Sequence, residues 1–173
     1  MNSNLKHLCG RRKLKHRVWL GKQDWGDRVV EGIIDVAEKP AIPRKAKARG
    51  RLELQSETTA QIKAGPLKKG DVLEASTIAA IQAVKETPRI VPHCHPIPIE
   101  GCWVEWTWED SSLICTVTVK ATYRTGVEME ALTGVSAGLL CAWDMVKSLE
   151  KDEHGQYPNA KISDIVVLEK WKG

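Results

Sequence analysis

Long apolar runs are absent from this 173-residue chain, which nowhere has 18 or more apolar residues in succession. Its N-terminus also lacks the apolar stretch that follows the charges of a secretory signal. We therefore expect no membrane segment and a cytoplasmic protein. The sequence has no internal repeat and no low-complexity linker, so its length predicts one domain with a core of its own.

Cysteine is also scarce, with five residues at irregular spacing and no C-x-x-C pair. This pattern indicates neither a disulfide framework nor a zinc knuckle. Reduced thiols are the simplest expectation.

Basic residues are concentrated near the N-terminus. Residues 1–28 hold eight Lys and Arg against two Asp, so the rest of the chain is slightly negative although the net charge is +4. We expect residues 1–23 to form a basic, mobile arm and residues 24–173 to form a single domain. The arm could alternatively bind nucleic acid or an acidic surface through its cations.

Apolar periodicity predicts an α+β domain. Helices are expected at 56–64, capped by Ser56, at 72–87, after a capping-box-like Asp71 and Glu74, and at 128–149. Strands are expected at 29–36, 44–54, 103–109, 113–123 and 162–168, the third and fourth joined as a hairpin. Antiparallel strands covered by two main helices favour a ferredoxin-like fold.

The segment "IVPHCHPIPI" places His93, Cys94 and His95 between two prolines. On an extended segment the two histidines point to one side and could share a metal ion. No third or fourth ligand is evident, however, and we predict no metal site. A rigid turn would hold a histidine for proton transfer or anion binding, although a histidine with only a structural hydrogen bond fits the segment equally well.

Two pairs of charged residues lie on the predicted helix 128–149. Asp144 and Lys147 are neighbours at i, i+3 in an apolar setting, which favours an acid/base couple. Glu128 and Glu130 lie at the start of the same helix. Fourteen residues at about 1.5 Å each separate Glu130 from Asp144 by roughly 21 Å. Either the pairs have unrelated roles, or symmetry in an oligomer brings them together.

Four segments in order carry a family resemblance: "IIDVAEKP", "KKGDVLEASTIAAIQAVKETPRIVPHCHPIPI", "RTGVEMEALTGVSAGLLCAWDMVKSLEK" and "ISDIVVLEK". The chain resembles the molybdenum cofactor biosynthesis protein C family, the cyclic pyranopterin monophosphate synthases, from about residue 24 to residue 170. Four segments at matching spacing are more specific than any one short motif.

The resemblance implies a lyase that rearranges (8S)-3′,8-cyclo-7,8-dihydroguanosine 5′-triphosphate to cyclic pyranopterin monophosphate and releases pyrophosphate. It implies catalytic roles for Asp144 and Lys147, which would move protons during ring opening and reclosure. The positions that it implies for substrate binding are Lys69, Lys85, Cys94, His95, Glu128, Met129 and Glu130.

The resemblance further implies a ferredoxin-like fold and a hexamer, a trimer of dimers with sites between subunits. No cofactor is required, although Mg²⁺ could accompany the triphosphate, and a radical S-adenosylmethionine GTP cyclase would supply the substrate. Two departures stand out. His93 replaces a residue that is often apolar in the family, and the C-terminal tail is shortened to "LEKWKG".

A non-catalytic ferredoxin-like module that binds a nucleotide or RNA is the alternative. The basic arm and exposed tryptophans would then supply phosphate contacts and base stacking. The carboxylates of the predicted site and the absence of an RNP-like motif argue against this alternative.

Overall fold

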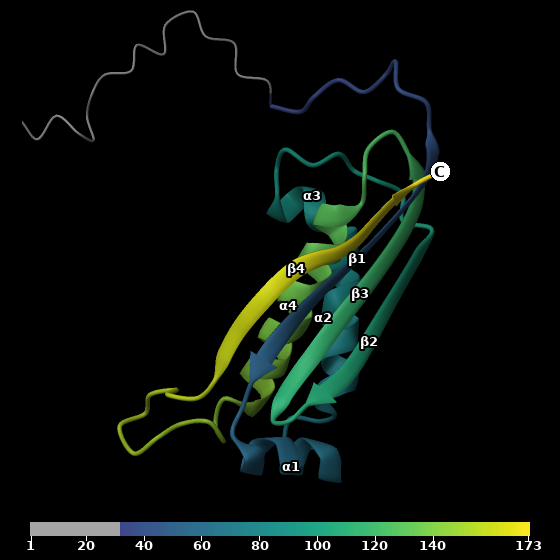
Figure 1. Cartoon of the computed structure of the whole chain (residues 1–173). Coiled ribbons are helices and arrows are strands. Elements are labelled where there is room, and N and C mark those ends of the chain that lie inside the picture. The colour runs from purple at the N-terminus through teal and green to yellow at the C-terminus, as the bar shows by residue number, and fades with distance from the viewer. Residues whose placement is uncertain (1–31) are drawn as a thin grey trace, which may run out of the picture. The chain divides into compact units, whose positions relative to one another are not determined.

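The computed structural model describes residues 32–173, which form a four-stranded antiparallel sheet in the order β2-β3-β1-β4 with helices packed against it (Figure 1). The strands are β1 (Ile42–Glu53), β2 (Gly101–Glu109), β3 (Ser112–Tyr123) and β4 (Lys161–Lys172). The helices are α1 (Ser56–Ala64), α2 (Val72–Lys85), α3 (Thr87–Ile90) and α4 (Glu128–Val146). This order of elements and strands confirms the predicted ferredoxin-like α+β fold. The basic arm predicted at residues 1–23 lies outside the described residues.

The core forms between the sheet and the two long helices, α2 and α4. Alternate residues of β1, Ala46, Ala48 and Leu52, are fully buried, as the alternation of apolar and charged residues predicts. Gly50 lies on the same inner face. A Cβ there would lie 2.7 Å from Val135 Cγ1 and 2.8 Å from Leu139 Cδ1, so glycine allows α4 to approach the sheet closely.

The other face of β1 carries a row of basic side chains, and carboxylates compensate them. Lys45 pairs with Glu169, and Lys47 pairs with Glu105. Arg49 and Arg51 both reach Glu109 on β2. Exposed pairs of this kind contribute at most about 1 kcal/mol each. Because of these ion pairs, this face of the sheet is not uniformly cationic.

The predicted helix starts differ in how they are capped. The Asp71 carboxylate accepts the Glu74 backbone N–H at 2.8 Å, which confirms the expected cap of α2. Ser56 is not the cap but the first residue of α1, and Gln55 occupies the N-cap position. The buried Glu150 carboxylate accepts the Gln55 backbone N–H at 3.1 Å. A carboxylate nearly a hundred residues away cannot be recognised from the local sequence.

The ends of three further predicted elements differ from the prediction. Helix α2 ends at Lys85, and the short helix α3 follows with Pro88 in its first turn, where a missing N–H costs nothing. Helix α4 ends at Val146 rather than 149. Strand β4 is longer than expected and runs to Lys172 along the edge of the sheet.

The strand predicted at residues 29–36 was wrong for the part that the structure describes. Residues 32–39, here called the strap, have no strand partner. Two of their carbonyl oxygens, those of Gly32 and Ile34, instead accept hydrogen bonds from histidine side chains. The apolar residues of this segment therefore do not belong to the sheet, and two of them, Ile34 and Val36, line a cavity. No helix in the described part of the chain is long and apolar enough to cross a membrane.

Candidate functional site

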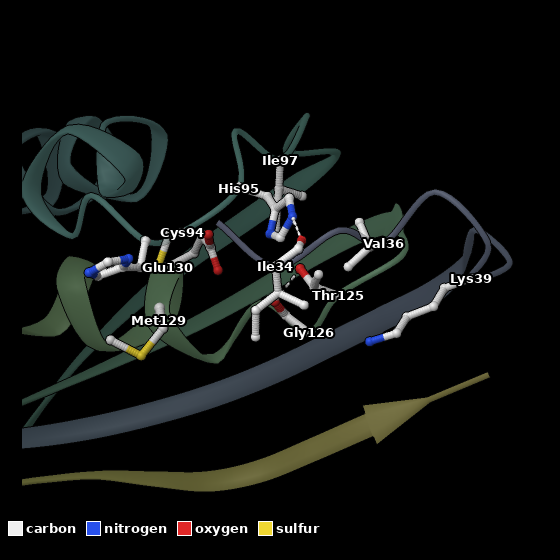
Figure 2. A pocket seen from close by; sticks show the side chains of 11 residues that line it. Ile34, Val36, Lys39, Cys94, His95, Ile97, Thr125, Gly126, Met129 and Glu130 are labelled. Carbon is white, nitrogen blue, oxygen red and sulfur yellow. Dashed lines mark hydrogen bonds between the residues drawn. The ribbon is translucent and has the colours of Figure 1, made fainter. Parts of the chain in front are cut away.

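A cavity of about 250 Å³ lies where the strap, the histidine turn and the start of α4 meet (Figure 2). Three segments far apart in the sequence contribute its walls. The lining residues are Ile34, Val36 and Lys39 from the strap, His93, Cys94, His95 and Ile97 from the turn, and Thr125, Gly126, Met129 and Glu130 around the start of α4. The cavity thus gathers Cys94, His95, Met129 and Glu130, four of the predicted substrate-binding residues.

Both histidines of the turn are held by the strap. His95 Nε2 lies 2.8 Å from the Ile34 carbonyl oxygen, and His93 Nδ1 is bonded to the carbonyl oxygen of Gly32. Because a carbonyl can only accept, these two ring nitrogens carry protons. In residues 32–173 the structure assembles no group of three His, Cys, Asp or Glu side chains that could hold a metal ion.

Glu130 is the most unusual group of the cavity. The residue is only 2 % exposed, and among the described residues its Oε2 atom has no hydrogen-bond partner. Burial is the main reason why its pKa rises to about 7, the charge of Glu128 adds to the rise, and a backbone hydrogen bond opposes it. Burial and the nearby Glu130 also raise the pKa of the Cys94 thiol. A buried carboxyl oxygen without a partner is suited to accept a donor from a ligand.

Glu128 lies in the same turn of α4 but does not line the cavity. Its Oε1 atom is 2.5 Å from Lys170 Nζ on β4, so an ion pair joins the last strand to the first turn of α4. Gly126 leaves room for this carboxylate, since a Cβ there would lie 1.8 Å from Glu128 Oε2. The two predicted glutamates therefore have different surroundings: Glu130 lines the cavity, whereas Glu128 pairs with Lys170.

A second cluster forms at the far end of α4. Lys147 Nζ lies 2.6 Å from Asp144 Oδ1, and Lys69 Nζ lies 2.8 Å from Asp144 Oδ2. Lys69 also donates to the Asp144 backbone carbonyl at 2.7 Å. The hydrogen bond from Lys147, followed by that from Lys69, lowers the Asp144 pKa to about 2. Lys69, predicted to bind substrate, thus joins the predicted catalytic couple.

The expectation that burial removes Asp144 and Lys147 from water was wrong for a single subunit. Both side chains are about half exposed, and their apolar neighbour Leu140 is 63 % exposed at the surface. The Asp144 carboxylate raises the Lys147 pKa, and burial opposes this only weakly. Lys147 is consequently protonated at neutral pH, which favours an acid or an electrophile over a base.

A hollow of about 520 Å³ lies beside this couple, and its walls are partly aromatic. Leu140, Trp143 and Tyr157 line it together with Asp144 and Lys147. The rings of Trp143 and Tyr157 meet edge to face, with centroids 6.2 Å apart. Lys85, the remaining predicted residue, is exposed at the end of α2 and lines neither hollow.

A model of the MoaC family matches residues 33–173. The chain belongs to the MoaC family. Two curated relatives carry the name "Probable cyclic pyranopterin monophosphate synthase". The one from Thermococcus kodakarensis is 53 % identical over 141 residues, which cover 82 % of this chain and 90 % of the relative. The one from Methanosphaerula palustris is 52 % identical over 148 residues, or 86 % of this chain and 95 % of the relative.

Apart from Lys85, the residues that the MoaC resemblance singles out thus fall into two groups at opposite ends of α4. The helix is continuous from Glu128 to Val146, so the rise per residue places Glu130 and Asp144 roughly 21 Å apart within one subunit. Sequence reasoning missed Lys39 and the strap as parts of the site. The only available signal was that Lys39 lies in "IIDVAEKP", one of the segments that carry the resemblance.

Proposed function

We propose that this chain is a cyclic pyranopterin monophosphate synthase of molybdenum cofactor biosynthesis. It converts (8S)-3′,8-cyclo-7,8-dihydroguanosine 5′-triphosphate to cyclic pyranopterin monophosphate and releases pyrophosphate. The observation that carries the proposal is the identity of about half of the residues, over more than 80 % of the chain, with relatives that bear this name. All the positions that the resemblance assigns to catalysis and substrate binding are occupied as it implies.

Two chemical tasks follow from this reaction. In the phosphoryl step, a substrate hydroxyl oxygen gives its proton to water and forms a bond to the α-phosphorus, while the bond from that phosphorus to the oxygen of the leaving pyrophosphate breaks. Fixed cations must stabilise the charge that develops on the leaving group, and the resemblance assigns Lys69, Lys85 and His95 to it. The ring rearrangement needs proton transfers, which are assigned to Lys147 and Asp144.

The geometry at the end of α4 defines what the catalytic couple can do. Asp144 is anionic at neutral pH and lies between two ammonium groups, so it orients Lys147 and does not act as an acid. Lys147 can donate a proton to a ring nitrogen or oxygen of the substrate and recover it afterwards. Lys69 holds the other oxygen of Asp144 in place.

An active site shared between subunits explains the two separated clusters. Glu130 from one subunit would face Asp144 and Lys147 from another, and a hexamer built as a trimer of dimers supplies this symmetry. We include in the proposal a cytoplasmic location, a supply of substrate by a radical S-adenosylmethionine GTP cyclase, and no resident cofactor. Mg²⁺ would enter only with the triphosphate.

The alternative of an RNA-binding module finds no support in the sheet. The cations of β1 on its open face are paired with Glu105, Glu109 and Glu169. A phosphate backbone would have to displace these carboxylates, and no specific observation favours that function.

Turnover of the cyclised nucleotide tests the proposed function directly. Purified full-length protein should release one pyrophosphate for each molecule of enzymatically prepared 3′,8-cyclo-dihydro-GTP consumed, and the organic product should be cyclic pyranopterin monophosphate by mass spectrometry. The GTP precursor should not react. Absence of product from folded protein would refute the assignment.

Mixing of inactive subunits tests whether the site is shared. Glu130→Gln and Asp144→Asn each remove one half of the site, so we expect neither variant alone to turn over. After unfolding and joint refolding in equal amounts, about a quarter of the sites should combine two intact halves. Recovery of about a quarter of the wild-type rate is the expected result. A mixture as inactive as its components would place both halves within one subunit.

A further inference from the structure

Lys39 is a cation of the cavity that none of the predicted roles uses. It ends the strap, lines the same cavity as His95 and Glu130, and points back toward the other lining residues (Figure 2). The ion pairs formed within residues 32–173 do not include Lys39. Its charge is therefore uncompensated by the described part of the chain.

The strap that carries Lys39 is fixed at several points. Its carbonyls at Gly32 and Ile34 accept bonds from the two histidines of the turn. Val36 is 8 % exposed and anchors the strap, and the backbone N–H of Lys39 donates to the Val36 carbonyl at 3.0 Å. Because this backbone is already fixed, little conformational entropy would be lost when Lys39 binds a ligand in the cavity.

The obvious internal partner for Lys39 would be Glu130, but the two groups do not neutralise each other. An ammonium in contact with the carboxylate would lower its pKa, whereas burial keeps the Glu130 pKa raised to about 7. No ion pair forms between them. The cavity thus combines a carboxyl oxygen that lacks a donor with a cation that lacks an anion.

A ligand that satisfies both groups must carry hydrogen-bond donors and an anion. We propose that Lys39 binds the phosphate groups of the substrate and the pyrophosphate that leaves, while the strap holds it in the cavity that His95 also lines. This inference rests on the proposed function, because a nucleotide-derived triphosphate supplies both the ring donors and the anion. It adds a phosphate-binding lysine outside the set that the resemblance assigns.

Binding of inorganic pyrophosphate to the full-length protein tests the proposal without turnover. Isothermal titration calorimetry would compare wild type with Lys39→Met, which removes the charge and keeps the chain length, and Lys39→Arg, which keeps the charge. Lys161→Met is the matched control, because it removes an exposed lysine at the start of β4 that pairs with Glu53. All proteins would be compared at equal oligomeric state.

We expect Lys39→Met to weaken pyrophosphate binding about 10- to 100-fold, the usual effect of losing one hydrogen bond to a charged group. The KM for the cyclised nucleotide should rise in parallel, and Lys39→Arg should restore most of both. The control should bind like wild type. Equal pyrophosphate binding by wild type and Lys39→Met would overturn the proposal while leaving the synthase assignment intact. Wild-type protein that neither binds pyrophosphate nor turns over would overturn both.

Discussion

Replacing Lys147 with methionine is expected to lower kcat by about 10²- to 10⁴-fold, the range for loss of a general acid. The ammonium lies 2.6 Å from Asp144 and is protonated at neutral pH, so its removal deletes the only proton donor of the predicted couple. Lys69 remains bound to Asp144, and both side chains of the couple are about half exposed. The fold should therefore survive the substitution, and single-turnover pyrophosphate release would measure the loss.

Lys151→Met is the matched control for this prediction. It removes the same group from an exposed residue four positions further along the chain, outside both hollows. We expect its kcat to equal that of wild type. A Lys147→Met enzyme with kcat within about threefold of the control would exclude Lys147 from proton transfer.

Stability should fall as the pH rises from about 4.5 to about 7, because of Glu130. Its folded-state pKa of about 7 lies above the ordinary value of 4.5, so between these values the folded protein holds a proton that the unfolded chain releases. The contribution of Glu130 to the free energy of unfolding is fully present below pH 4.5 and is lost as the pH rises to 7. The loss amounts to about 3 kcal/mol, at 1.36 kcal/mol per pKa unit.

Glu130→Gln isolates this effect, since the amide has the same shape and does not titrate in this range. Urea unfolding of the two proteins at one protein concentration, at pH 5 and at pH 7.5, would measure it. We expect wild type to lose about 2 kcal/mol more than the variant between these conditions, because part of the full loss has already occurred at pH 5. Equal losses would show that Glu130 already has a partner in the assembled protein.

Much of the fold follows from periodicity in the sequence. The alternation of small apolar and basic residues along β1 predicts its two faces, and the turn between β2 and β3 was expected from its polar residues. The long helix was predicted because small apolar residues bury a broad face of α4. These features depend on neighbours within a few residues, which a single sequence displays.

The strap and the exposure of the predicted catalytic couple could not be predicted in this way. The carbonyls of Gly32 and Ile34 accept hydrogen bonds from side chains about sixty residues away, and no local sequence pattern indicates such bonds. The apolar residues around Asp144 look like core residues in sequence, yet Leu140 lies on the surface. Periodicity separates apolar from polar faces, but it does not tell whether an apolar face meets the core or another subunit.

The pairing of β1 also limits when the sheet can be completed during translation. This strand lies between β3 and β4, and its register joins Arg44 to Lys172, close to the two ends of the described chain. During translation β1 emerges early, but the edge that pairs with β4 stays unpaired until residues 161–172 have left the ribosome. Such non-local pairing makes folding slow. The nascent chain therefore exposes an open strand edge until β4 emerges, and a chaperone that shields it should raise the yield of native protein.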